Sequence, residues 1–313
     1  MNLLVATFFA IAGAGAFGLW ISRVVKMRGA CLRQVVFINE TLSTSKQAAD
    51  DRRIIISLST LPDRIGNLRP TLECLMQQTR PPDEIVLALP GFSIRQQQPY
   101  VIPRFLREFR GLRILRAERD WGPATKSIPA IQDEIAAGRP ETLIMVVDDD
   151  RVYPHDAVET YLHYNSQFPD AALCFRGAAM PHSFDWRRAK MIHGNRLQAP
   201  RRVAVITGCG SYLLKPRFFN EAFWDYSAAP PAAFYMDDIW ISGSLDRRGV
   251  KKYVVPSSTR LRSVKQQQRA MSLHDVPRGR QANNNEVIEF FRPGWNVFPE
   301  PASGRKKSLP DQI

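Results

Sequence analysis

Short apolar runs and helix-patterned segments alternate along the first half of the chain. Residues 53–58 are almost continuously apolar, which is typical of a strand covered on both faces of a sheet. Leu68, Leu72 and Leu75 then recur at helical spacing, and two prolines at 81–82 stop that helix. Further strands are expected at residues 84–89, 111–115 and 142–147, and a further helix at 124–137. This alternation predicts an α/β domain with a mostly parallel sheet flanked by helices.

The pattern continues less regularly beyond residue 150. Helices are expected at residues 155–168 and 238–248, and strands at 171–175 and, as the last one, 252–255. Residues 203–214 form an apolar stretch that glycines interrupt. The simplest interpretation is one α/β domain over residues 52–299, followed by a polar, basic tail at 300–313 that we expect to be disordered.

The N-terminal segment has the pattern of a membrane anchor. Residues 3–22 carry no charge and have about the length that a helix needs to cross a bilayer. Basic residues follow this run and none precedes it, which places the C-terminal side in the cytosol. We therefore expect a single-pass transmembrane helix with its basic flank at residues 1–28 and a stem at 29–51. A buried core helix is the alternative, but the run lacks the polar face of an amphipathic helix.

Composition and charge narrow the classes of function. Hydrophobic residues make up 44% and charged residues 23%, which excludes a mainly disordered chain. The four cysteines form no CxxC pair, so neither a disulfide scaffold nor a zinc site is indicated. The net charge of +13 implies an acidic partner, namely anionic lipid, a phosphorylated substrate or nucleic acid. Nucleic acid is not expected as a partner, because the chain has no recognised nucleic-acid-binding motif.

Three consecutive aspartates, Asp148, Asp149 and Asp150, directly follow the strand expected at residues 142–147. Ligands of open α/β sheets bind beyond the carboxyl ends of the strands, which is where these side chains fall. Three adjacent carboxylates repel one another, and Mg²⁺ or Mn²⁺ would compensate their charge. Asp148 and Asp150 project to the same side and can share one metal–diphosphate unit. The alternative is a solvated acidic turn.

A second acidic pair, Asp237 and Asp238, precedes the helical pattern that follows it. A carboxylate at this position would act as a base on an acceptor hydroxyl, or orient it. The alternative is structural: Asp237 would cap the helix and Asp238 would lie in its first turn.

Candidate cations and a candidate imidazole ligand accompany these acids. Lys126 falls in the first turn of the helix expected at 124–137, where a cation opposes the helix dipole and a bound phosphate would explain its position. A solvated surface lysine is the alternative. Arg64 follows the first strand in the same way. His274 is a candidate metal ligand, although a single histidine more often has a structural role.

The order of these motifs resembles that of the GT-A nucleotide-sugar glycosyltransferases. The shared order is a first strand, a loop with Thr60 and Arg64, a strand with the sequence PDEI at 82–85, a DxD pattern within the three aspartates, and a late Asp-Asp pair. The segments MVVDDD, QFPD and DDI look like those of exostosin-like transferases, and PDEI looks like family 2. The resemblance covers roughly residues 52–275, about two thirds of the chain.

The resemblance implies a donor site for a nucleoside-diphosphate sugar. Asp148 and Asp149 would contact the nucleotide, Asp148 at its ribose. Asp150 would bind Mn²⁺ or Mg²⁺ on the diphosphate, and His274 would be a weaker, C-terminal metal ligand.

The resemblance also implies roles for the remaining candidates. Thr60, Arg64 and Lys126 would hold the base or the phosphates of the donor. Asp237 and Asp238 would be the catalytic pair, with Asp238 facing the acceptor or the donor sugar.

The implied reaction is metal-dependent transfer of a sugar to a hydroxyl acceptor. The expected cytosolic side and the lack of paired cysteines favour a lipid-linked or cell-envelope glycan as that acceptor. Two alternatives remain open: a nucleotidyltransferase, which also gathers carboxylates around a metal, and a membrane-tethered protein that binds nucleotide sugars without turnover.

Overall fold

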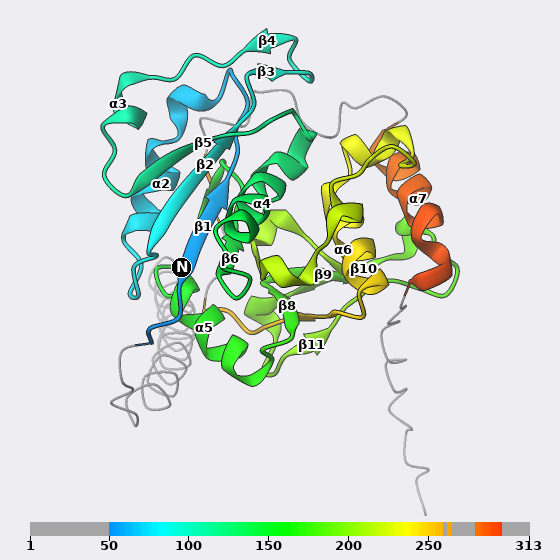
Figure 1. Cartoon of the computed structure of the whole chain (residues 1–313). Coiled ribbons are helices and arrows are strands. Elements are labelled where there is room, and N and C mark those ends of the chain that lie inside the picture. Colours follow the sequence, from blue (N-terminus) through cyan, green and yellow to red (C-terminus); the bar gives the residue numbers. More distant parts are fainter. Residues whose placement is uncertain (1–49, 259–261, 265–278, 296–313) are drawn as a thin grey trace, which may run out of the picture. The chain divides into compact units, whose positions relative to one another are not determined.

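The computed structural model describes residues 50–258, 262–264 and 279–295 (Figure 1). Its largest element is an eight-stranded sheet with the strand order β11-β14-β8-β13-β6-β1-β2-β5. In chain order these strands are β1 (Ile54–Leu58), β2 (Glu84–Leu89), β5 (Leu112–Arg116), β6 (Leu143–Val146), β8 (Ala171–Cys174), β11 (Arg201–Arg202), β13 (Tyr212–Leu214) and β14 (Lys251–Val254).

The sheet is mostly parallel, as the sequence predicts. The pairs β1–β2, β1–β6, β2–β5 and β8–β14 are parallel. Strand β13 runs antiparallel to both of its neighbours, and β11 runs antiparallel to β14. Shorter strands form a sheet of β10 (Lys190–His193), β9 (Arg176–Ala179) and β12 (Val205–Ile206), and the pairs β3 (Phe92–Ser93) with β4 (Gln98–Pro99) and β7 (Arg151–Val152) with β15 (Arg262–Ser263).

Both faces of the large sheet are buried. In β1, Ile54, Ile56 and Leu58 pack in one apolar cluster and Ile55 packs in the other, as the alternation of a strand requires. Helices α2 (Arg69–Met76), α3 (Arg104–Arg107) and α5 (Ala157–Gln167) contribute to the first cluster. Helices α4 (Ile128–Ala136), α6 (Asp237–Arg247) and α7 (Gly279–Phe291) contribute to the second. The prediction of a first strand covered on both faces is therefore confirmed.

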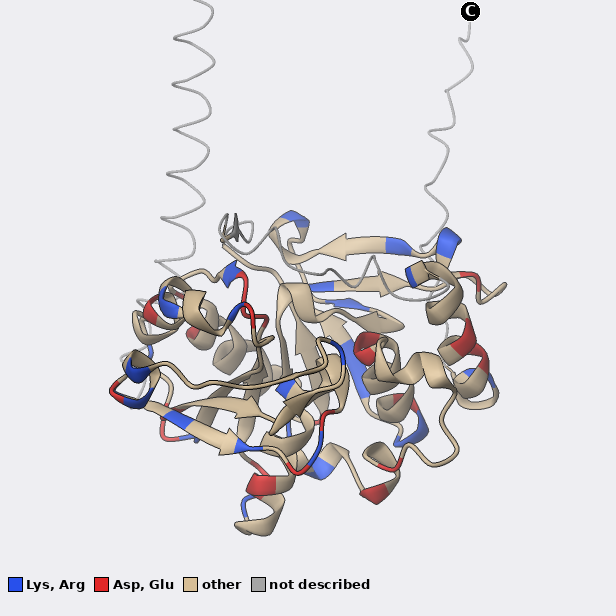
Figure 2. Ribbon diagram, turned by 90° about the horizontal axis from the view of Figure 1, so that it is seen from above, with Lys and Arg blue, Asp and Glu red and all other residues tan. Residues whose placement is uncertain are grey.

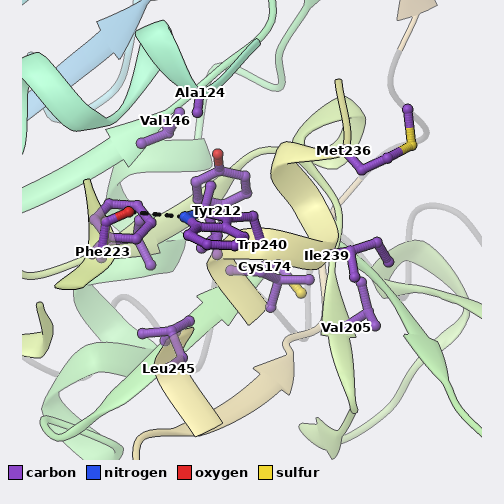
Figure 3. Close-up of a cluster of buried hydrophobic side chains, with 14 of the residues drawn as sticks. Ala124, Val146, Cys174, Val205, Tyr212, Phe223, Met236, Ile239, Trp240 and Leu245 are labelled. Atoms are coloured by element: carbon purple, nitrogen blue, oxygen red, sulfur yellow. Dashed lines mark hydrogen bonds between the residues drawn. The ribbon is translucent and has the colours of Figure 1, made fainter. Parts of the chain in front are cut away.

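Helix α6 is fixed by the large indole of Trp240. This side chain is 2% exposed and lies among Cys174, Tyr212 and Phe223 (Figure 3). Its Nε1–H donates to the backbone oxygen of Phe223 at 2.8 Å, which satisfies the polar atom of the ring. Because Trp240 lies in the first turns of the helix, its packing also fixes the position of the residues that begin α6.

Parts of the predicted pattern differ from the observed elements, and others had no predicted element. The helix expected at 124–137 begins at Ile128, because Pro129 fits only a first helical turn, and residues 122–126 form a 3₁₀-helix instead. Residues 203–214 divide into β12, a 3₁₀ turn at Gly208–Gly210 and β13. The last strand is not β14, since β15 follows it, and α7 was not predicted at all.

Several predicted segments lie outside the described residues: the anchor at 1–28, the stem at 29–49, the tail at 300–313, and His274. Among the residues that the structure does describe, no helix is both long and apolar enough to cross a membrane.

Candidate active site

A cavity of about 220 Å³ lies at the carboxyl ends of the parallel strands β1, β5 and β6. Its walls come from the loops that follow these strands, from the turn before β13, from the start of α6, from the β3–β4 hairpin and from α7. The charged lining residues are Arg64, Arg95, Asp120, Lys126, Asp148, Asp149, Asp150, Asp237, Asp238 and Arg280. Uncharged lining residues with a hydroxyl or thiol are Ser59, Thr60, Tyr100, Thr125 and Cys209. The structure thus brings all the predicted site residues that it describes to one cavity.

Asp149, the middle aspartate, is held by the protein itself. The Thr60 hydroxyl donates to Oδ2 at 2.6 Å, and Arg64 Nη1 lies 3.2 Å from Oδ1. The Thr71 hydroxyl donates to the backbone oxygen of Asp149 at 2.9 Å. Burial raises the pKa of Asp149 to about 6, although Arg64 acts in the opposite direction. In this structure, Thr60 and Arg64 therefore position Asp149.

Lys126 joins the two acidic motifs. Its Nζ lies 2.7 Å from Oδ1 of Asp148 and 3.0 Å from Oδ2 of Asp237. Burial alone would lower the pKa of Lys126, but the two carboxylates raise it well above its ordinary value. Burial alone would raise the pKa of Asp148, but the positive charge of Lys126 has the larger effect, and the pKa of Asp148 is lowered. Lys126 is an internal ion-pair partner rather than the solvated surface lysine of the alternative interpretation.

Gly208 allows this close arrangement. A Cβ at this position would lie 2.5 Å from Lys126 Nζ and 3.2 Å from Asp238 Oδ1. Without the Cβ, the Gly208 N–H comes near enough to donate to Asp238 Oδ1 at 2.7 Å. Burial, together with the adjacent Asp237, raises the pKa of Asp238 to about 7.

The helix that bears the second acidic pair begins with that pair. Asp237 and Asp238 occupy the first turn of α6, where the helix dipole favours negative charge, and Met236 is the residue before the helix. The structural alternative correctly placed Asp238 in the first turn of the helix. It was wrong to make Asp237 the cap, since Met236 occupies that position. The same two residues also line the cavity, so the structural and the chemical interpretation are both compatible with their position.

Asp150 is the third aspartate, and its side chain is 30% exposed. Its carboxylate lies 3.3 Å from Arg151 Nε, and its backbone oxygen accepts a hydrogen bond from the Val264 N–H at 2.8 Å. Burial and the charge of Asp148 raise the pKa of Asp150. A cation at this position would relieve that repulsion.

The cavity contains more acidic than basic side chains. Six carboxylates line it against three arginines and one lysine. Elsewhere Lys and Arg are spread over many elements of the ribbon (Figure 2). The net positive charge of the chain is therefore not concentrated in this cavity, and a diphosphate would enter it more easily together with a cation.

The donor set fits a divalent metal only in part. Asp148 and Asp150 supply the hard carboxylate oxygens that Mg²⁺ and Mn²⁺ prefer, and both line the cavity. Within the described ranges, no group of three His, Cys, Asp or Glu side chains is arranged to hold a metal ion by itself. The residues present therefore fit a cation that shares its ligands with a diphosphate, since Mg²⁺ is commonly bound through one or two carboxylates plus substrate phosphates.

Sequence reasoning missed several lining residues. Asp120 follows β5, so the rule that had located the three aspartates would also have found it. Arg95 and Tyr100 come from the β3–β4 hairpin, and Arg280 comes from α7. Neither element has a clear pattern in the sequence, so no signal pointed to these three residues.

Comparisons with known proteins add only distant similarities. No family model and no curated protein sequence matches the chain. A structure of GalNAc-T7 with UDP, GalNAc and Mn²⁺ aligns with 76% of this chain and 48% of its own, at a TM-score of 0.46 and 14% identity. 4-Diphosphocytidyl-2C-methyl-D-erythritol synthase aligns at a TM-score of 0.41 and 11% identity, over 70% of this chain and 95% of its own.

A third solved structure, S. aureus TarS 1-349, aligns at a TM-score of 0.38 and 11% identity, over 65% of this chain and 60% of its own. The alignment with GalNAc-T7 covers about half of the length of that protein. The topology itself, a mostly parallel sheet flanked by helices with the aspartates beyond a central strand, fits the GT-A type of fold that the sequence predicts.

Proposed function

We propose that this protein transfers a sugar from a nucleoside-diphosphate sugar to a hydroxyl acceptor with the aid of Mn²⁺ or Mg²⁺. The observation that carries the proposal is the convergence of two acidic motifs on one cavity. Asp148 and Asp237 lie far apart in the sequence, yet both pair with the same amine of Lys126. An arrangement of this kind at the carboxyl edge of a parallel sheet suits a ligand that spans from one motif to the other.

Asp148 and Asp150 would hold the metal together with the diphosphate of the donor. The metal, when bound, would supply Lewis-acid stabilisation of the charge that develops on the departing diphosphate. Arg64, Arg95 and Arg280 line the same cavity and add positive potential for the phosphates. His274, predicted as a further weak ligand, remains part of the proposal.

Asp238 would act on the acceptor. The bond between the anomeric carbon and the diphosphate oxygen breaks, and its electron pair leaves with the nucleoside diphosphate. The acceptor oxygen bonds to the anomeric carbon, and its proton passes to the Asp238 carboxylate. A base with a pKa near the working pH suits this step, and the pKa of Asp238 is about 7.

The acceptor we propose is a lipid-linked or cell-envelope glycan. The support for it comes from the uncharged run at residues 3–22 and the basic residues after it, which predict a single-pass anchor with the domain on the cytosolic side. Such an anchor would hold the cavity near lipid-linked substrates.

The test is a panel of nucleotide sugars, assayed with the full-length protein for release of nucleoside diphosphate, with Mn²⁺ and after its removal by EDTA. Metal-dependent release with one or more donors is expected. Asp150→Ala should lower the rate by roughly 10²-fold, by analogy with the loss of other electrostatic stabilisers, and should weaken Mn²⁺ binding measured by calorimetry in the presence of the donor.

Asp170→Ala is the matched control, because the side chain of Asp170 is 78% exposed and lies outside the cavity. It should leave both the rate and Mn²⁺ binding unchanged. Full metal-dependent transfer by Asp150→Ala would contradict the proposal. Release of pyrophosphate from a nucleoside triphosphate and a sugar phosphate, supplied in place of the nucleotide sugar, would select a nucleotidyltransferase. Binding of the nucleotide sugar without any release would select a binding protein.

A further inference from the structure

The β3–β4 hairpin exposes apolar side chains beside the cavity. Phe92 is 47% exposed, Ile94 is 50% exposed and Val101, just after β4, is 77% exposed. We refer to these three residues as the apolar rim. Ser93, between the first two, is 0% exposed. The strand alternation is thus inverted, with the polar residue inside and the large apolar residues in water, so packing of the core does not explain it.

The apolar rim is next in the chain to residues that line the cavity. The Ile94 N–H donates to Asp120 Oδ2 at 2.8 Å, and Asp120 lines the cavity. The Tyr100 hydroxyl donates to the backbone oxygen of Thr60 at 2.8 Å. Arg95 and Tyr100, the immediate neighbours of the rim residues, line the cavity themselves. The hairpin that carries the rim is therefore hydrogen-bonded to the walls of the cavity.

The segment that follows the rim is basic. Arg104, Arg107 and Arg110 are all exposed, and we call them the basic flank. Over residues 91–110 the sequence has four arginines, with no lysine or aspartate and with Glu108 as its one acidic residue. Figure 1 shows the hairpin and α3 on the same side of the sheet, joined by one length of chain.

We propose that the apolar rim and the basic flank dock this part of the domain, beside the cavity, on an anionic lipid surface. Exposed apolar side chains next to arginines are the combination that binds such an interface, through apolar insertion and attraction to anionic headgroups. The contact is separate from the anchor expected at residues 1–28. It would also present the cavity to acceptors that are embedded in the membrane.

The experiment is amide hydrogen exchange of residues 91–110 in the full-length protein, reconstituted in vesicles of phosphatidylcholine alone or of equal parts phosphatidylcholine and phosphatidylglycerol. Slower exchange in the anionic vesicles is expected. Salt at about 1 M should remove the difference, since it shortens the Debye length to ~3 Å. The measurement does not require turnover, so its result is independent of the proposed transfer reaction.

Two variants test the two halves of the surface. Phe92→Ser/Ile94→Ser/Val101→Ser should abolish the extra protection, whereas Ile135→Ser, at a 40% exposed apolar residue on α4, should retain it. Arg107→Gln/Arg110→Gln should lower the ratio of docked to undocked protein by about fivefold per arginine.

The controls separate docking from misfolding and from self-association. Arg187→Gln/Arg188→Gln changes two exposed arginines on another element and should have no effect on protection. Far-UV circular dichroism of every variant should match that of the wild type. Equal exchange in neutral and anionic vesicles, or unchanged protection in the triple variant, would overturn the proposal. Protection that rises with protein concentration in the absence of vesicles would indicate a second copy on the rim and would also overturn it.

Discussion

Replacing Lys126 with methionine is the most direct test of the bridge between the acidic motifs. Methionine keeps an apolar stem of similar length and removes the amine that lies 2.7 Å from Asp148 and 3.0 Å from Asp237. The side chain of Lys126 is 9% exposed, that of Asp237 is 5% exposed and that of Asp148 is 25% exposed. The substitution therefore leaves two carboxylates without their common countercharge in a place that water reaches poorly.

The free energy of unfolding should fall by about 3–5 kcal/mol, the usual cost of removing one partner from a buried ion pair. The measurement is urea denaturation of the full-length protein at neutral pH, followed by tryptophan fluorescence. Lys126→Met/Asp237→Asn should recover part of the loss, because it also removes one of the two uncompensated charges.

Lys215→Met is the matched control. The side chain of Lys215 is also 9% exposed, but its partner Glu141, at 2.9 Å, is 63% exposed. Water stabilises the exposed carboxylate of Glu141 without a countercharge. Loss of this ion pair in Lys215→Met should therefore lower the free energy of unfolding by only about 0–1 kcal/mol. If Lys126→Met costs no more than Lys215→Met, the electrostatic account of the bridge is wrong.

Two further changes probe the framework that carries the site. Burial alone would raise the pKa of Glu134, but hydrogen bonds from Arg139 and other donors lower it from 4.5 to about 2. Glu134→Gln should therefore lower the free energy of unfolding at pH 7 by about 3 kcal/mol. Because the pKa of Glu134 is lower in the folded state than in the unfolded state, the stability difference between wild type and Glu134→Gln should shrink as the pH falls from 4.5 toward 2. Urea denaturation at a series of pH values measures it, and a difference that stays constant would refute the prediction. Gly122 has φ +60°, and a Cβ added there would lie 2.2 Å from the backbone oxygen of Phe234. At Gly249 φ is +70°, but no atom lies within 4 Å of an added Cβ. Gly122→Ala should therefore lower the melting temperature more than Gly249→Ala does. Backbone strain alone accounts for about 1–2 kcal/mol at either glycine, and equal losses would show that the contact with Phe234 does not matter.

The elements that the sequence predicted well are those with a strong local pattern. The strand at 84–89 agrees with β2 at both ends, because the continuous apolar run at 85–89 is bounded by Asp83 and Glu84 on one side and by Pro90 on the other. Helix α7 was missed because its buried face begins with Asn283 and Asn284, which have low helix propensity. Its apolar residues Val287, Ile288 and Phe291 obtain their partners only from the second apolar cluster. That tertiary packing cannot be read from a local window.

The sequence predicted the location of the candidate site better than the contacts within it. Aspartates that follow a buried strand had to lie at the carboxyl edge of the sheet, and the structure places them there. Their individual partners depend on side-chain direction, which the sequence does not specify. Asp149 is held by Thr60 and Arg64 within the fold, whereas Asp148 pairs with Lys126. Residues from irregular segments, such as Arg95, had no positional rule to identify them.

The ion-pair bridge has a consequence for how the chain matures. Lys126 and Asp148 lie in the segments that follow β5 and β6, whereas Asp237 begins α6, which comes after β13 in the chain. A nascent chain that ends before residue 237 would lack the second carboxylate, and the pocket would remain incomplete until the later segment docks.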